Sequence, residues 1–158
     1  MGLNGYVFPG LPYDRWELDK EYVTGARTIT EGDAVNFAGL SGDWGAAHTN
    51  DVYGKTTVFG DRIVYGNMTF IASTGLMSQT LMFEGTTVAM LDMRVSYQKP
   101  VRFGDTIYCK FTPIDKRECK RENHGLVTFK VFVLNQNGEQ VAEEILVFMI
   151  SNKIQQET

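Results

Sequence analysis

The sequence predicts an α+β fold in which an antiparallel sheet packs on one long central helix. The hydrophobic period is helical over residues 66–83 and changes to the alternation typical of strands after Gly85. Several strand patterns then follow one another without an intervening helix, which excludes a parallel Rossmann sheet. The length of 158 residues fits one domain, which we expect to span residues 1–158.

The N-terminal third is expected to hold one short helix between irregular segments. Residues 1–22 carry scattered proline, glycine and aromatic residues, typical of an irregular arm. Thr30 and Asp33 have the spacing of a capping box, and the helix that they begin is expected to end just before Asp43. Residues 43–60 are rich in Gly, Thr, Asn and Asp, which indicates a long ordered loop with room for a helical turn. Loops of this length inside a small domain usually carry function.

Residues 66–83 have the pattern of one long helix. Their apolar side chains recur near the helical period, and no proline interrupts them. We expect this helix to be largely buried and to be stopped by Gly85. The small residues at 72–75 would let a sheet wrap closely around it.

The segment after Gly85 predicts an antiparallel meander. Apolar residues at alternate positions indicate strands with one buried side and one side in water, and an Asn-Gly pair marks a tight turn before the last strand. The last strand, over residues 141–150, is apolar on both sides. The buried positions predicted for the preceding strands are Leu91, Met93, Val95 and Tyr97, then Ile107, Cys109 and Phe111, then Val127, Phe129, Val131 and Val133.

Composition and charge limit the class of protein. Apolar residues make up 43% and charged residues 22%, the balance of a globular domain. The net charge of −4 argues against nucleic acid as a partner. Two cysteines, Cys109 and Cys119, are too few for a disulfide framework. Because the sequence has no signal-peptide pattern and no apolar stretch of about 18 residues, we expect a cytoplasmic protein with no membrane partner.

The two histidines differ in their surroundings. His124 lies in a turn between predicted strands, where an exposed structural side chain is the ordinary finding. His48 lies five positions after Asp43 in the irregular loop, with mostly small residues between them. A carboxylate and an imidazole that share a water form a proton-transfer pair near neutral pH. Two structural alternatives stay open: an Asx-turn or cap at Asp43, and a His48 ring held by a loop carbonyl.

Gly66 is expected to begin the long helix. Amides at a helix N-terminus lack partners within the helix and favour negative charge, so the Gly66 N–H is a candidate donor to a carbonyl oxygen. The alternative is a glycine that only makes a sharp turn. No further His or Cys lies near His48 in the sequence, and no nucleotide-binding, serine-hydrolase or Cys-x-x-Cys motif occurs. We therefore expect no cofactor and no metal.

The candidate pair lies in a recognisable motif. Gly42, Asp43 and His48 match Gly-Asp-x-Asn-Pro-x-His in identity and spacing, with Gly45 and Ala46 in place of Asn-Pro. In this the chain resembles the MaoC-like dehydratases, the hotdog-fold relatives of the (R)-specific enoyl-CoA hydratases.

Two further segments support the resemblance. Residues 59–66 are similar to the family's Phe-x-x-x-Ile-x-His-Gly motif, with Tyr65 in place of the histidine. Residues 97–106 are similar to its Pro-Val-x-x-Gly-Asp-Thr segment. The resemblance covers about residues 23–151.

The resemblance implies a hotdog fold and reversible addition of water to a trans-2-enoyl-CoA, which gives an (R)-3-hydroxyacyl-CoA. It implies His48 as the base on the water, Asp43 as the group that orients the water and exchanges the proton at C2, and the Gly66 N–H as donor to the thioester oxygen. It also implies homodimers or dimer-based oligomers with active sites at the subunit interface. The substrate-binding candidates that it gives are Trp44, Ile63, Tyr65 and Thr74.

Two other activities remain open at this point. A hotdog thioesterase would place an acid on or near the central helix, but Glu84 lies only at its predicted end. A non-catalytic acyl-CoA-binding protein stays possible because the Asn-Pro pair is lost. The basic residues considered for the CoA phosphates, none of them assigned, are Arg62, Lys99, Arg102 and Lys110.

Overall fold

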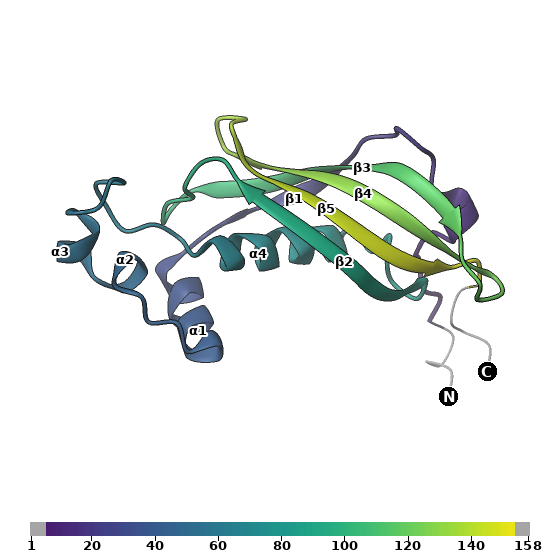
Figure 1. The fold of residues 1–158 in the computed structure, drawn as a ribbon, viewed down its shortest axis with the longest axis horizontal. Helices are drawn as coiled ribbons and strands as arrows, with labels where there is room; N and C mark the ends of the chain where they lie inside the picture. The colour runs from purple at the N-terminus through teal and green to yellow at the C-terminus, as the bar shows by residue number, and fades with distance from the viewer. Residues whose placement is uncertain (1–5, 154–158) are drawn as a thin grey trace.

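A computed structural model of the chain describes residues 6–153. Five strands form one antiparallel sheet in the order β1-β3-β4-β5-β2, and the long helix α4 lies along one face of it (Figure 1). This architecture confirms the predicted α+β fold. The strands are β1 (Tyr22–Thr28), β2 (Thr87–Tyr97), β3 (Thr106–Glu118), β4 (His124–Asn135) and β5 (Gln140–Ser151). The helices are η1 (Tyr13–Arg15), α1 (Glu31–Ser41), α2 (Ala46–Thr49), α3 (Asp51–Gly54) and α4 (Gly66–Gln79).

Strands β3 and β4 bury the positions that alternation predicts. Sγ of Cys109 in β3 lies 3.8 Å from the Ser73 carbonyl of α4, so this side of the sheet packs on the helix. The predicted buried positions of these strands are confirmed as fully buried: Ile107, Cys109, Phe111, Val127, Phe129, Val131 and Val133.

The predicted meander holds for three strands only. β3, β4 and β5 are consecutive neighbours, and Gly138, with φ of 74°, makes the tight turn between β4 and β5. β2 pairs with β5 and not with β3. The connection between β2 and β3 therefore runs from one edge of the sheet, formed by β2, to the strand next to the opposite edge.

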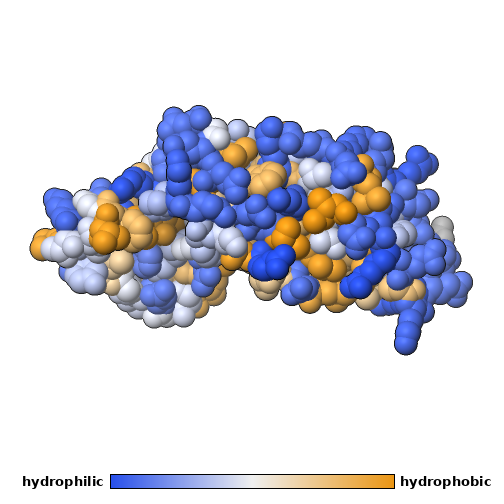
Figure 2. Space-filling view, turned by 45° about the horizontal axis from the view of Figure 1, so that its top comes forward, coloured by the Kyte–Doolittle hydropathy of each residue, from blue (hydrophilic) through white to orange (hydrophobic). Residues whose placement is uncertain are grey.

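β2 is an edge strand, and the side of it that was predicted to be buried is largely exposed. Leu91, Met93 and Tyr97 are 50%, 55% and 48% exposed. Alternation places side chains on a common face, but it does not say which element covers that face. Figure 2 shows hydrophobic surface on the sheet side of the molecule and again at the end that carries α1 to α3.

α4 ends at Gln79, four residues before the predicted end. Leu81 has φ of 62°, a left-handed conformation that stops the helix. The residues after it hold the N-terminal arm, because the Met82 carbonyl accepts the Leu11 N–H at 2.8 Å. Gly85, with φ of 76°, lies in the following turn. The helix buries one side, and its buried residues are Met68, Thr69, Ala72, Ser73, Leu76 and Met77.

The N-terminal arm is irregular apart from η1, and Tyr22 already belongs to β1. Residues 1–5 of the predicted arm lie outside the described residues. Trp16 anchors the arm, since its buried ring packs on Phe129 with centroids 4.9 Å apart. Across residues 6–153, no helix combines the length and the apolar character needed to cross a membrane.

Glu144 of β5 is a fully buried carboxyl group beneath α4. Its Oε1 lies 2.6 Å from the Ser73 hydroxyl, which lies 2.7 Å from the Phe70 carbonyl. Because a hydroxyl has one proton, both contacts are satisfied when Glu144 itself is protonated and the serine donates to Phe70. Burial accordingly raises the pKa of Glu144 to about 7.

We expect Glu144→Gln to remove a pH-dependent loss of stability. The folded protein holds this proton more tightly than the unfolded chain, so its contribution is full below the ordinary pKa of 4.5 and is lost as the pH rises through about 7. The loss amounts to about 3 kcal/mol. Urea unfolding at acidic and at mildly alkaline pH measures it, and the same pH dependence in both proteins would contradict the assignment.

Candidate active site

Asp43 and His48 lie on a projecting segment, residues 31–60, that extends beyond one end of the sheet. α1, α2 and α3 lie near the N-terminal end of α4 and extend past the strands (Figure 1). The capping box predicted at Thr30 and Asp33 is confirmed, and Gly42, with φ of 75°, ends α1 directly before Asp43. The predicted loop over residues 43–60 contains two short helices, α2 and α3, where one turn was expected.

Arg62 contacts all three helices of the projecting segment. Its guanidinium forms ion pairs with Asp51 of α3 and, at 2.6 Å, with Glu31 of α1. It also donates to the His48 carbonyl at 3.4 Å and lies 5.0 Å from the centre of the Phe103 ring. The Arg62 side chain is only 16% exposed, so α1, α2 and α3 meet around one largely buried cation.

The backbone at Gly45 brings Asp43 and His48 together. Oδ1 of Asp43 accepts the Gly45 N–H at 3.0 Å, which is the predicted Asx-turn. A Cβ atom at position 45 would lie 3.0 Å from that same oxygen and 3.4 Å from Cδ2 of His48. The carboxylate and the imidazole therefore lie on the same side of this glycine. The Asx-turn leaves the Asp43 side chain exposed, so it is compatible with a chemical role.

The His48 ring is oriented by a backbone carbonyl. Its Nδ1 lies 2.7 Å from the carbonyl oxygen of Ile63. A carbonyl oxygen can only accept, so the proton of the neutral ring is assigned to Nδ1. Nε2 then carries the lone pair and can take a proton. Ile63, a predicted substrate-binding residue, thus contributes its main chain to the orientation of His48.

Tyr65 is almost fully buried, at 2% exposure, and contacts both members of the pair. Its hydroxyl donates to the Asp43 carbonyl at 2.8 Å, and its ring stacks on His48 with centroids 4.0 Å apart. Burial and the Asp43 carboxylate raise the pKa of Tyr65, so the hydroxyl keeps the proton that it donates.

Gly66 begins α4, and its N–H has no partner within the helix. The ring of Tyr97 covers this glycine, since a Cβ atom here would lie 3.0 Å from the nearest ring atom. Both residues line a cavity of about 300 Å³, together with Ile63 and Thr69. The position of Tyr97 over Gly66 was not predicted, although it begins the segment 97–106 that carries part of the resemblance.

His48 lines a more polar cavity of about 330 Å³. Trp44, Arg62 and Glu31 contribute to its walls. Trp44 is 60% exposed, so it forms an outer wall of this cavity. The projecting segment thus offers open space next to His48.

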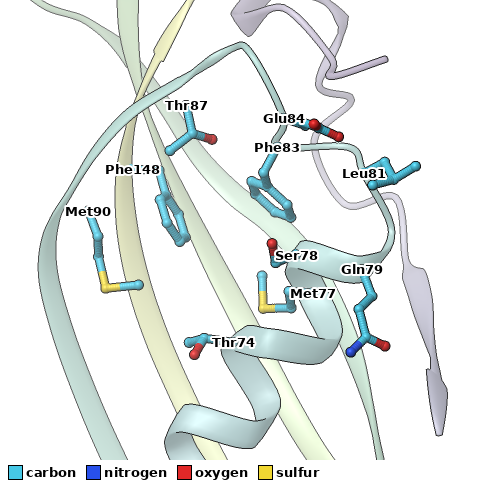
Figure 3. A pocket seen from close by; sticks show the side chains of 10 residues that line it. All are labelled: Thr74, Met77, Ser78, Gln79, Leu81, Phe83, Glu84, Thr87, Met90 and Phe148. Carbon is cyan, nitrogen blue, oxygen red and sulfur yellow. The ribbon is translucent and has the colours of Figure 1, made fainter. Parts of the chain in front are cut away.

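Thr74 lines a different cavity, further along α4. It follows Gly66 by eight residues, or about 12 Å along the helix axis. This cavity has a volume of about 630 Å³, and the side chains of Met77, Phe83 and Phe148 form much of its wall (Figure 3). Its lining residues are Thr74, Met77, Ser78, Gln79, Leu81, Phe83, Glu84, Thr87, Met90 and Phe148. They come from α4, β2, β5 and the turn after α4, so no single sequence pattern identified them.

The remaining candidates have structural partners. His124 begins β4, and its Nδ1 lies 2.6 Å from the Glu122 carbonyl oxygen. Within residues 6–153, no three His, Cys, Asp or Glu side chains gather as a metal site requires. Besides Arg62, the basic candidates are also engaged: Lys99 with Glu139 at 2.5 Å, Lys110 with Glu21 at 2.9 Å, and Arg102 with the Phe59 carbonyl at 2.8 Å.

A sequence profile described as "MaoC like domain" matches residues 16–134. The chain belongs to the MaoC-like family. An (R)-specific enoyl-CoA hydratase of Rhodospirillum rubrum is 34% identical to this MaoC-like chain over 124 residues, which cover 77% of the chain and 76% of the relative. A 3-hydroxybutyryl-CoA dehydratase of Methylorubrum extorquens is 30% identical over 86 residues, covering 53% of the chain and 52% of the relative.

Solved structures agree with this assignment. The monoamine oxidase regulatory protein of Archaeoglobus fulgidus superposes with a TM-score of 0.80 at 27% identity, over 91% of the MaoC-like chain and 96% of its own. An R-hydratase of Pseudomonas aeruginosa gives a TM-score of 0.69 at 25% identity, over 91% and 88%. A Mycobacterium tuberculosis protein described as having a double hotdog fold gives 0.78 at 13% identity, over 94% and 46%. The hotdog fold implied by the resemblance is confirmed.

Proposed function

We propose that the chain acts as a single MaoC-like domain that adds water reversibly to a trans-2-enoyl-CoA and gives an (R)-3-hydroxyacyl-CoA. The observation that carries the proposal is the contact between Nδ1 of His48 and the Ile63 carbonyl, because it leaves Nε2 as a base near Asp43. Support comes from relatives named (R)-specific enoyl-CoA hydratase and 3-hydroxybutyryl-CoA dehydratase, which describe the two directions of one reaction.

In the hydration direction, Nε2 of His48 takes a proton from a water that Asp43 orients, and the water oxygen bonds to C3 of the substrate. The electrons of the C2=C3 bond move toward the thioester, and the enolate oxygen accepts the Gly66 N–H. The proton on His48 then passes to Asp43, and Asp43 delivers it to C2. His48 and Asp43 end in their starting states, and the thioester bond stays intact.

The acyl chain is proposed to run along α4 from Gly66 toward the cavity at Thr74. The walls of that cavity are largely apolar, and its volume of about 630 Å³ suits a hydrocarbon segment. Met77 and Phe148, which line it, would then set the length and branching of the acyl groups that bind.

A homodimer, or an oligomer built from dimers, is part of the proposal. The exposed apolar side chains of Leu91, Met93 and Tyr97 lie on an edge strand, which is where a second copy can cover them. Exposed Trp44 and Phe59 add apolar surface on the projecting segment. Sedimentation analysis tests this part separately, and a monomer at micromolar concentration would contradict it.

The test is a spectrophotometric assay on short, branched and aromatic 2-enoyl-CoA substrates, with free thiol measured in parallel. Hydration removes the enoyl absorbance and releases no thiol, and this is the expected result. Release of thiol would instead identify a thioesterase. Binding of acyl-CoA without either change would identify a non-catalytic protein, and both of these outcomes contradict the proposal.

A further inference from the structure

We infer that Tyr65 is a positioning residue that holds both members of the candidate pair in place without touching the substrate. The kinetic consequence of this inference rests on the proposed function. The geometric part rests on two contacts of Tyr65 that are independent of any substrate. One contact is to the main chain of Asp43, and the other is to the ring of His48.

The first contact anchors the projecting segment at Asp43. Asp43 is exposed and lies 22 residues before Tyr65, yet its carbonyl accepts the Tyr65 hydroxyl at 2.8 Å. Tyr65 is also the N-cap residue of α4, directly before Gly66. One buried side chain therefore links the carboxylate-bearing loop to the helix end that presents the Gly66 N–H.

The second contact fixes the plane of the His48 ring. The bond from Nδ1 to Ile63 holds one edge of the imidazole but leaves it able to tilt about that bond. Stacking on Tyr65 at 4.0 Å, with 29° between the planes, restricts that tilt. Phe37 of α1 packs on Tyr65 with ring centroids 4.8 Å apart and so helps to hold the Tyr65 ring in place. The electron-rich face of the tyrosine also stabilises the imidazolium that forms when His48 takes a proton.

The local sequence explains why His48 needs contacts that orient its ring. Gly45 and Ala46 stand where the related motif has Asn-Pro, so the backbone just before His48 lacks the rigidity of a proline. Tyr65 itself stands where that motif has histidine. Both departures contact His48, since the Gly45 carbonyl accepts the His48 N–H at 3.0 Å and Tyr65 stacks on the ring. The contacts of Tyr65 therefore add a restraint that the loop backbone does not supply.

The geometric part is tested by NMR of the histidine ring protons, without any substrate. His48 and His124 are the two histidines of the chain, so the signals are readily assigned. Stacking on an aromatic face shifts the His48 ring protons upfield. We expect this shift in the wild type and in Tyr65→Phe, and its loss in Tyr65→Leu. His48 signals that are the same in the wild type and in Tyr65→Leu would overturn the inference.

Kinetic measurements on two Tyr65 variants separate the contributions of the two contacts to kcat. Tyr65→Phe, which loses only the bond to Asp43, is expected to lower kcat about tenfold with little change in KM, and Tyr65→Leu to lower it about a hundredfold. Phe111→Leu removes an equally buried aromatic ring from the core and is expected to leave kcat within about twofold, although it lowers the melting temperature.

A double variant then distinguishes positioning from general damage. If Tyr65 acts by positioning Asp43 and His48, adding Tyr65→Leu to His48→Ala lowers the residual rate by no more than the roughly tenfold assigned to the contact with Asp43, because the stacking contact no longer has a ring to position. A further hundredfold loss in that background would overturn the inference. If the wild type hydrates no enoyl-CoA, the proposed function fails, while the NMR comparison still decides whether Tyr65 holds His48.

Discussion

His48→Ala is expected to lower kcat for hydration of a 2-enoyl-CoA by roughly a thousandfold, and Asp43→Asn by a similar factor. Alanine removes the nitrogen that takes the proton from water. Asparagine keeps the shape of Asp43 and its bond to the Gly45 N–H, but it can neither hold a negative charge next to the water nor exchange a proton. Initial rates at saturating substrate measure both effects.

Matched controls are available for both changes. His124→Ala removes the other histidine, which lies at the start of β4, and Asp92→Asn alters an exposed aspartate of β2. Both controls are expected to keep full activity. Thermal unfolding of all four variants verifies that they fold. If His48→Ala or Asp43→Asn retained a tenth of the wild-type rate or more, the assignment of the pair would be wrong.

The second large effect is expected from Gly66→Pro, which should lower kcat by roughly a hundredfold to a thousandfold. Proline lacks the N–H that is proposed to bind the enolate oxygen, yet it is favoured at the first position of a helix. Tyr65, with φ of −58° and ψ of 134°, already has a conformation that a following proline requires. The change therefore removes the donor while the helix can still begin at this residue.

Gly66→Ala is the control for this prediction. Both variants add a Cβ atom about 3 Å from the ring of Tyr97, so both require that ring to shift. Only the proline variant loses the N–H. We expect the alanine variant to lose about tenfold or less, mostly through KM, because Tyr97 lines the neighbouring cavity. Equal losses of kcat in the two variants would show that space, and not the N–H, matters at this position.

The core of the fold could be predicted because its signals are local. The alternation in β3 and β4, the capping box at Thr30 and the Asn137-Gly138 turn each depend on a few neighbouring residues, and each is present in the structure. The end of α4 could not be predicted in the same way. The helix stops where Leu81 takes a left-handed conformation, and the next residue, Met82, bonds to Leu11 of the distant N-terminal arm.

Burial at the edge of the sheet depends on what covers it. The alternation of Leu91, Met93 and Tyr97 correctly indicates a strand, but a single chain leaves these residues exposed. Periodicity carries no information about a covering element from a distant segment or from a second copy of the chain. The prediction of a buried face was therefore wrong for the isolated chain.

The sequence predicted the residues of the candidate site but not the contacts that hold them in place. Asp43, His48 and Gly66 could be chosen from spacing and from the motif. A loop carbonyl bound to the His48 ring is one of the two structural alternatives given by the sequence, but its identity as Ile63 could not be chosen because a backbone acceptor has no sequence signature. The covering ring of Tyr97 could not be predicted either, because Tyr97 lies 31 positions after Gly66. Tyr65 was singled out as a substrate-binding candidate, while the structure brings it into contact with both members of the pair.

Addition of water across the C2=C3 bond of a 2-enoyl-CoA is the reaction proposed for this chain. The most direct measurement is NMR of the product that the wild type forms in deuterated water. We expect an intact thioester with a hydroxyl at C3 in the R configuration and one deuterium at C2. Free CoA, a product of S configuration, or unchanged substrate at enzyme concentrations that bind it would contradict the proposed hydration.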